Sequence, residues 1–168
     1  EGAIKADGGN GICCSAAGGS GGGIRIDVGT LRGTGTVGAN GGSGANSNGS
    51  GGGGGKVAIY FQDATAFNFT AQVSAFGGTR GGDTRSQNGG AGTTFLQGPG
   101  RESGEVVVDN NTVIAPFLST PLIPQPLGNL RIRRGAKGIV DALFNLTGAL
   151  EVSSSGELTL SNNRLSAA

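Results

Sequence analysis

The chain has 168 residues, a net charge of +1 and 37 glycines, roughly three times the usual share of glycine. Only 35% of its residues are hydrophobic, and it holds no Trp, no Met and one Tyr, so an ordinary globular core is hard to build. Near-neutral charge argues against nucleic acid as the main partner, and no apolar run reaches the length of a membrane span. β-branched clusters such as Ile24-Arg25-Ile26 argue against disorder. A repetitive β architecture remains, in which regular hydrogen bonding offsets the entropy cost of ordering glycine.

Two motifs recur in step along the first part of the chain. The first is a four-residue motif with a small residue, any residue and then Gly-Gly. It begins at Ala6, Ala39 and Ala75, which gives offsets of 33 and 36 residues. A glycine-rich stretch followed by an apolar alternation keeps the same period. It reads Gly21-Gly22-Gly23-Ile24-Arg25-Ile26, then Gly53-Gly54-Gly55-Lys56-Val57-Ala58-Ile59, then Gly89-Gly90-Ala91-Gly92-Thr93-Thr94-Phe95-Leu96. Two motifs in one period predict a solenoid of stacked units.

Within each unit, period-two alternation predicts half-buried strands, at Ile24–Val28, Val57–Phe61 and Phe67–Ala75. Glycine allows tight corners and close approach of stacked backbones. The predicted fold class is therefore all-β, a parallel β-helix with glycine-rich loops. Polyglycine-II-like strands are an open alternative for those loops, because only glycine lets such strands approach closely. The run Gly51–Gly55 is either a loose surface loop or a strand of that kind.

The composition changes near Gly104, because 32 of the 37 glycines lie at or before it. Val106–Val108 predicts a strand, and four prolines in Ala115–Leu127 predict an extended connection. Short Leu-rich strands are predicted after it, at Leu130–Ile132, Leu143–Leu146, Leu150–Val152 and Leu158–Leu160. The predicted organisation is residues 1–104 as about three glycine-rich units, 105–127 as a strand plus proline-rich connection, and 128–168 as narrower β coils or a capping meander.

Three segments carry a resemblance: Lys56–Phe61 after its glycines, Gly89–Leu96 and Gly104–Asn111. They resemble modules of large, repetitive bacterial proteins of the parallel β-helix, adhesin-like type, which are secreted or surface-exposed. The resemblance implies an extracellular or cell-surface location and a non-enzymatic structural or adhesive role in a fibre or filament. The implied partners are further copies or other surface proteins. Two alternatives stay open: a carbohydrate-binding or polysaccharide-cleaving module, and a segment of a phage tail fibre.

The sequence gives little support for an enzymatic function. Glycoside hydrolysis needs two carboxylates about 5 to 10 Å apart on one face. The candidates are Asp27, Asp63, Asp83, Asp109, Glu102 and Glu105. Only Glu102 and Glu105 are close in sequence, and they are predicted to lie in a solvated loop. Arg80, Arg85 and Arg101 are weak candidates for the base of a polysaccharide lyase. We assign no catalytic residue and predict that the chain is not an enzyme.

No cofactor or metal site is predicted. The chain has no histidine and no C-x-x-C spacing, which leaves no zinc site, and Gly8–Cys13 lacks the Asp of calcium-binding nonapeptide repeats. A single Ca²⁺ held by main-chain carbonyls is the open alternative. The basic cluster of Arg131, Arg133, Arg134 and Lys137 is predicted to be a solvated strand face, with a phosphate or acidic-glycan site as the alternative. Cys13-Cys14 is predicted to be a small buried pair in a tight turn, with pairing to each other or to another chain left open.

Overall fold

The computed structural model describes residues 2–46, 48–82, 85–115, 118–123, 126–161 and 165–167. Its elements from the glycine-rich part are β1 (Ala3–Lys5), β2 (Gly23–Thr30), β3 (Thr36–Gly38), β4 (Lys56–Asp63), α1 (Phe69–Gln72), β5 (Val73–Ser74), β6 (Thr93–Gly98) and β7 (Arg101–Asp109). The remaining strands are β8 (Thr120–Pro121), β9 (Asn129–Arg133), β10 (Lys137–Val140), β11 (Phe144–Leu146), β12 (Leu150–Val152), β13 (Glu157–Leu160) and β14 (Leu165–Ala167).

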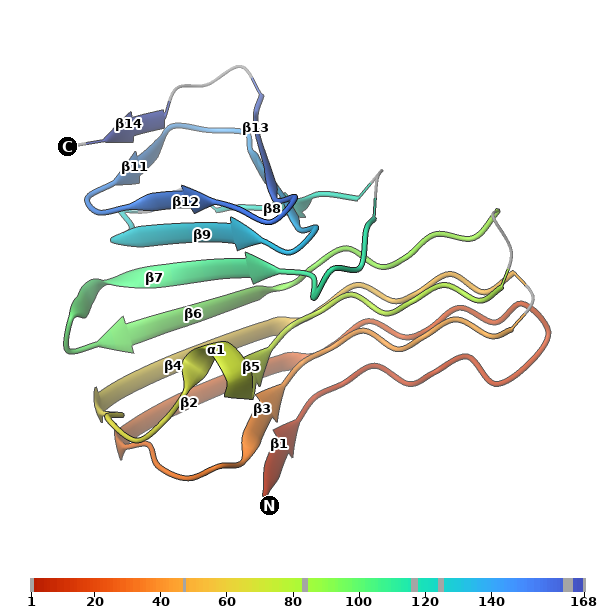
Figure 1. The fold of residues 1–168 in the computed structure, drawn as a ribbon, viewed down its shortest axis with the longest axis horizontal. Helices are drawn as coiled ribbons and strands as arrows, with labels where there is room; N and C mark the ends of the chain where they lie inside the picture. Colours follow the sequence, from red (N-terminus) through yellow and green to blue (C-terminus); the bar gives the residue numbers. More distant parts are fainter. Residues whose placement is uncertain are drawn as a thin grey trace.

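The predicted parallel β-helix is wrong. The largest sheet has six strands in the order β12-β9-β7-β6-β4-β2, and smaller sheets pair β1-β3-β5, β13-β10-β8 and β11-β14 (Figure 1). The pair β6–β7 is antiparallel, whereas the other pairs of this large sheet are parallel. In the described part of the chain the sheets do not close into one solenoid, and β6–β7 reverses the strand direction in the middle of the stack. The described residues thus form one mixed six-stranded sheet, three smaller parallel sheets and one short helix.

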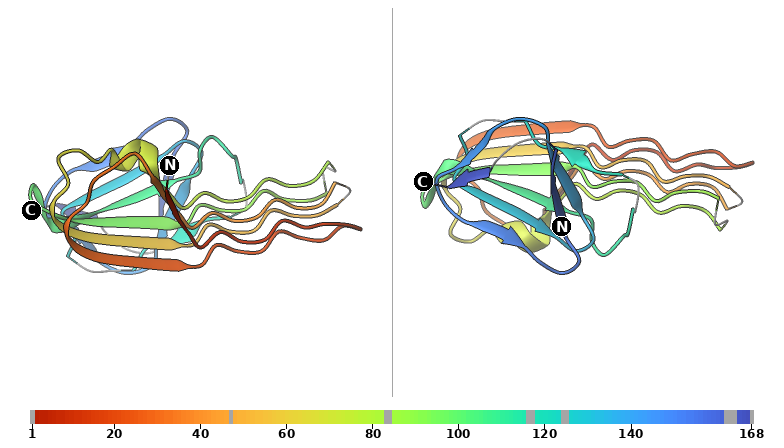
Figure 2. Two further views of the ribbon diagram at one scale, coloured as in Figure 1. Left: turned by 90° about the horizontal axis from the view of Figure 1, so that it is seen from below. Right: turned by 90° about the horizontal axis from the view of Figure 1, so that it is seen from above.

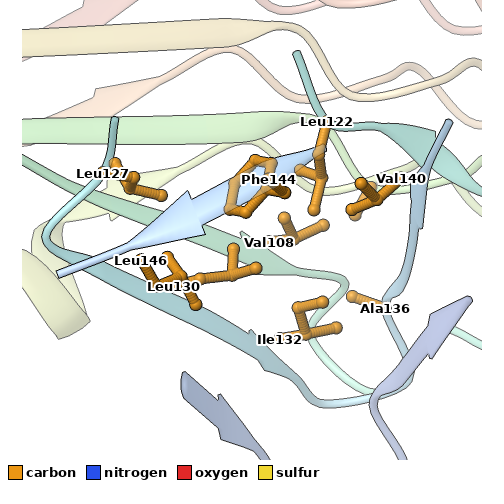
Figure 3. Packing of buried hydrophobic residues seen from close by; sticks show 10 residues of the cluster. Val108, Leu122, Leu127, Leu130, Ile132, Ala136, Val140, Phe144 and Leu146 are labelled. Carbon is orange, nitrogen blue, oxygen red and sulfur yellow. The ribbon is translucent and has the colours of Figure 1, made fainter. Parts of the chain in front are cut away.

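The hydrophobic core changes faces at this reversal. Val57, Ile59 and Phe61 of β4 pack toward β3 and β5, in one cluster with Val37 and Val73. Register places Ile59 beside Leu96 and Leu96 beside Glu105, so this face becomes charged on β7. The second cluster uses the opposite pleat of β7 and β9. It contains Val108, Leu122, Leu130, Ile132 and Phe144, which lie together in Figure 3.

Paired glycine-rich segments project from one end of the sheets and lie side by side (Figures 1 and 2). We call them the glycine slab: residues 6–12 and 16–22 in unit 1, 39–45 and 49–55 in unit 2, and 75–81 and 87–92 in unit 3. Main-chain N–H groups join successive units, as from Gly8 to the carbonyl of Asn40 and from Gly41 to that of Phe76, both at 2.8 Å. Others join the two layers, as from Gly52 to the carbonyl of Gly42 at 2.9 Å. Donors of each kind recur at every third residue, the repeat of a polyproline-II-type strand.

Glycine is required in the slab because neighbouring carbonyls occupy the space of a side chain. A Cβ on Gly52 would lie 2.0 Å from the carbonyl oxygen of Gly19, and one on Gly51 would lie 2.0 Å from that of Gly78. A Cβ on Gly53 would instead find its nearest atom at 3.9 Å. The run Gly51–Gly55 is therefore a strand with backbone neighbours on two sides and one open side, and not a loose loop.

The strand predicted over Phe67–Ala75 is largely wrong. Phe69–Gln72 forms a turn of helix, α1, and only Val73–Ser74 forms a strand. Asn68 accepts a hydrogen bond from the N–H of Ala71 at 3.2 Å, and the side chain of Gln72 accepts one from the N–H of Asn68 at 2.8 Å. These local side-chain bonds satisfy the main chain as a cap and compete with strand pairing.

Several predicted strands after Gly104 are confirmed. Val106–Val108 lies in β7, Leu130–Ile132 in β9, and Leu150–Val152 coincides with β12. Leu158–Leu160 lies in β13, and Phe144–Leu146 forms β11. Pro121 lies in β8 at the edge of its sheet, where a missing N–H is tolerated. Pro116 and Pro124 lie outside the described residues.

The prediction that Cys13 and Cys14 are buried is wrong. Cys13 and Cys14 lie in a tight turn at the end of the first glycine hairpin, where Ala16 donates its N–H to the carbonyl of Cys13. Both thiols are exposed and free, and Cys14 has a positive φ of 51°. Hydrogen bonding to Cys14 is the main cause that raises the pKa of Cys13.

Candidate functional site

The change of core face leaves a groove of about 830 Å³ on the side of the large sheet that faces away from β3 and β5. Its floor contains the outward side chains of β4 and β6, including Tyr60 and Phe95, together with glycine backbone from all three units. Its wall is the connection 118–123, with Leu127 and Phe144. This volume lies within the range of about 300 to 1,000 Å³ that is typical of small-ligand sites.

An aromatic pair forms the centre of the groove floor. The rings of Tyr60 and Phe95 are diagonal neighbours on adjacent strands, with centroids 5.6 Å apart. The guanidinium carbon of Arg25 lies 4.6 Å from the Tyr60 centroid, at the end of the floor, in a cation–π contact. Arg25 is held by Asp27, with 2.7 Å between Nε and Oδ2. An apolar surface with a fixed cation beside it can bind a ligand that has both apolar and polar faces.

The described lining of the groove contains no pair of carboxylates for glycoside hydrolysis. Its described lining residues include no carboxylate, and their titratable groups are the ammonium of Lys56 and the phenol of Tyr60. The hydroxyl of Thr120 donates to the carbonyl of Ala91 at 2.6 Å. Two placed proton-transfer groups would be needed for hydrolysis. The apolar floor of the groove can hold a ligand.

The opposite face of the sheet carries a buried carboxylate that the sequence analysis placed in a solvated loop. Glu105 lies inside β7 and is 2% exposed, so that prediction is wrong. Its Oε1 lies 2.8 Å from Nε of Arg131, and its Oε2 pairs with Arg101. Arg131 also contacts Glu151 of β12 at 3.4 Å. Arginines of β7 and β9 thus neutralise Glu105, and the ion-pair network extends to Glu151 of β12.

Asp109, at the end of β7, is held in a similar way. Its carboxylate lies 2.8 Å from Nε of Arg133 and 2.6 Å from an Nη atom of Arg134, and Asn111 donates an N–H to it at 2.9 Å. Glu105 and Asp109 are four residues apart on one strand, hence roughly 13 Å apart, which is beyond the spacing of a glycosidase pair. The cavity between them is only about 30 Å³. Both acids are held in ion pairs inside the fold.

The prediction that the basic cluster is a solvated strand face is therefore wrong. Arg131, Arg133 and Arg134 neutralise buried acids, and Nζ of Lys137 lies 2.6 Å from Oε2 of Glu157. Each member of the cluster thus has an acidic partner, and Arg133 and Arg134 share the single negative charge of Asp109.

The remaining sequence candidates in the described residues make local contacts. Hydrogen bonds from Thr65 lower the pKa of Asp63, led by the main-chain N–H, and the N–H of Gly100 lowers the pKa of Glu102. The side chain of Arg25 lowers the pKa of Asp27. Arg101 pairs with Glu105, and Arg80 donates to the carbonyl of Ser86 at 3.3 Å. Arg85 has a partner too, and Asp83 lies outside the described residues. Among the described acids, Asp27 and Glu102 line one open cavity of about 620 Å³, and each is held by a local hydrogen bond, to Arg25 and to the N–H of Gly100.

The described ranges contain no group of three His, Cys, Asp or Glu side chains that could hold a metal ion. In the same ranges α1, with four residues, is the one helix, and it is too short to cross a bilayer. The sequence analysis missed the groove. The alternation put Tyr60 on an outward face, but Phe95 and the connection 118–123 come beside it only through strand register and chain folding.

The chain matches no protein-family model, and searches of curated proteins and of solved structures found no significant match. The resemblance to repetitive bacterial surface proteins thus stays a prediction.

Proposed function

We propose that the chain is a non-enzymatic structural segment of an extracellular or cell-surface fibre. The observation that carries this proposal is the glycine slab. Three units stack through main-chain hydrogen bonds in two directions, and neighbouring carbonyls lie where side chains would stand. Such packing resists bending and shear, because every displacement breaks several bonds together. The buried charges are paired, which suits a load-resisting role rather than chemistry.

Amide hydrogen exchange tests the mechanical part of this proposal. We expect the amides of Gly42, Gly52 and Gly78 to exchange only through global unfolding, because each donates inside the slab. The exposed turn at Cys13-Cys14 is the internal control and should exchange freely. Slab amides that exchange as fast as this turn would contradict a rigid segment.

Two further measurements address place and activity. Electron microscopy of native material with a labelled antibody should locate the chain in filaments outside the cell. Incubation with a panel of polysaccharides should release no reducing ends. Release of reducing ends, lost in the Glu105→Gln variant, would refute a purely structural role.

A second candidate function, carbohydrate binding, is favoured by the groove. The CH faces of a sugar ring can lie on Tyr60 and Phe95 while its hydroxyls reach Lys56 or solvent. A glycan array would find the ligand, and calorimetric titration would measure it. Tyr60→Ala and Phe95→Ala should each abolish binding. Thr70→Ala, an exposed change away from the groove, is the matched control. Equal binding by all three variants would reject this site.

A further inference from the structure

On one side of the first unit of the glycine slab no further backbone is stacked, although the sequence of the unit suits such a neighbour. In unit 2, four carbonyls receive N–H groups from unit 1, at 2.8 to 2.9 Å. They belong to Asn40, Ser43, Ser50 and Gly53. Unit 3 accepts from unit 2 in the same way, through Phe76, Thr79, Gln87 and Gly90. The equivalent carbonyls of unit 1 are those of Asp7, Asn10, Ala17 and Ser20. In the described chain these four receive no main-chain N–H.

Three glycines give an independent sign of the same missing neighbour. In unit 2, a Cβ on Gly42, Gly52 or Gly55 would lie 2.0 to 2.1 Å from the carbonyl oxygen of the equivalent residue of unit 1. In unit 3 the corresponding distance is 1.9 Å for Gly78, Gly89 and Gly92.

The unit 1 equivalents are Gly9, Gly19 and Gly22, and all three are exposed. A Cβ on Gly9 would have no atom within 4 Å, and those on Gly19 and Gly22 would find their nearest atoms at 3.2 and 3.3 Å. Packing within the chain therefore does not explain why Gly9 is glycine. A further backbone stacked on unit 1 would explain it.

The opposite end of the slab carries a side-chain cap over part of unit 3, which gives the stack a direction. The side chain of Asn110 accepts the N–H of Gly77 at 2.7 Å and donates to the carbonyl of Gly89 at 3.1 Å. Asn110 is 1% exposed and takes the place of a fourth unit. A Cβ added to Gly90 would lie 3.2 Å from the Cβ of Leu118, so Leu118 covers Gly90 on this side.

This direction decides what can cover unit 1. Two copies meeting edge to edge would oppose carbonyl to carbonyl across the slab. A second copy stacked head to tail would present its capped end, where Asn110 already uses the N–H of Gly77. The fitting partner has free N–H groups at every third residue and a backbone without side chains on the facing side.

We propose that the open face of unit 1 docks a further glycine-repeat unit of the same kind, whose N–H groups donate to the four free carbonyls. The carbonyls of that unit then lie against Gly9, Gly19 and Gly22, and its strands extend the sheets at β1 and β2, which are terminal strands of their sheets. This inference rests on the proposed structural function and adds a direction to it. Further units stack on the unit 1 face, and the stack ends at the Asn110 face.

The test adds one unit to the full chain. A second copy of residues 3–35 is placed directly before Ala3, which preserves the natural connection because Ala3 and Thr36 are register equivalents in β1 and β3. Gly9→Ala is then made in the natural chain and, at the original Gly9, in the extended chain. Gly42→Ala in the natural chain is the reference for a covered position.

We expect Gly9→Ala to leave the urea midpoint of the natural chain unchanged or slightly raised. In the extended chain it should lower the midpoint as much as Gly42→Ala lowers that of the natural chain. The amides of the added unit should exchange at least tenfold more slowly than those of an unfolded peptide.

Three results would overturn the inference. The first is a Gly9→Ala substitution that leaves the urea midpoint of the extended chain unchanged. The second is an added unit whose amides are not protected from exchange. The third is a natural chain that forms a dimer which Gly9→Ala abolishes, because this would assign the face to a second copy. None of these concerns polysaccharide cleavage or slab rigidity in the natural chain, so the proposed function and the docking face fail separately.

Discussion

Alanine substitutions at two adjacent glycines of one run should change the free energy of unfolding in opposite directions. Gly52 and Gly53 have the same residue type, neighbours and glycine-rich surroundings, and neither has a positive φ. They differ in what a methyl group would meet. At Gly52 it would lie 2.0 Å from the carbonyl oxygen of Gly19, which is main chain and cannot rotate away. At Gly53 the nearest atom is 3.9 Å away.

The size of the effect at Gly52 follows from the bonds that its strand makes. Its N–H donates to Gly42, its carbonyl accepts from Gly78, and the affected carbonyl of Gly19 accepts from Gly42. Moving the strands apart by about 1 Å breaks two or three of these buried bonds, at about 1 to 3 kcal/mol each. We expect Gly52→Ala to lower the free energy of unfolding by about 3 to 6 kcal/mol, a large part of a typical total of 5 to 15 kcal/mol.

Gly53→Ala should instead raise the free energy of unfolding by roughly 0.4 to 1 kcal/mol, because alanine restricts the unfolded chain at a site where the native backbone accepts it. Urea unfolding monitored by circular dichroism measures both variants under one condition. The packing argument fails if Gly52→Ala is within about 1 kcal/mol of the natural chain, or if the two variants are destabilised alike.

Three further changes test the charged face, the cap and a local carboxylate. Glu105→Ala should lower the free energy of unfolding by about 1.5 to 3 kcal/mol, because it removes the buried acceptor of charged hydrogen bonds from the half-exposed Arg101 and Arg131, whereas Glu151→Ala, on the exposed side of Arg131, should cost less than about 1 kcal/mol; equal losses in urea unfolding would contradict this. Asn110→Ala should cost about 2 to 4 kcal/mol by the same measurement, because it leaves a donor and an acceptor of the slab end without partners, and a neutral result would refute the cap. Thr65→Ala should raise the pKa of Asp63 toward its ordinary value in an NMR titration, because one of its two donors is lost. The depressed pKa stabilises the fold above the unfolded-state pKa and this contribution is lost as the pH falls through the folded-state value, so the variant should lose it at a higher pH; an unmoved midpoint would contradict the assignment.

Part of the fold could be read from local pattern. Alternation at Val57–Phe61 is a property of a few consecutive residues, and it produced the strand β4 with Val57, Ile59 and Phe61 buried. The glycine repeat and its period of 33 to 36 residues are visible in the same way, since Gly42 lies over Gly9 and Gly78 over Gly42. The same reasoning failed at Phe67–Ala75, where Asn68 and Gln72 bond to the main chain and an apolar alternation becomes a turn of helix.

The candidate site depended on features that no local pattern contains. The antiparallel pair β6–β7 moves the core to the other face of the sheet, and this one reversal both buries Glu105 against Arg131 and opens the groove over Tyr60 and Phe95. Strand direction is set by long-range pairing, whose free energy is spread over many residues, so sequence near Glu102 and Glu105 reads equally well as a loop.

The sequence by itself determined that this chain stacks extended, glycine-spaced units, because glycine content and period limit what the backbone can do. Tertiary structure alone decided that the stack is not a closed solenoid, that its buried acids Glu105 and Asp109 pair with arginines, and that it has one capped and one open end. These outcomes depend on which N–H meets which carbonyl across 33 or more residues, and Gly9 differs from Gly42 only in having no backbone above it.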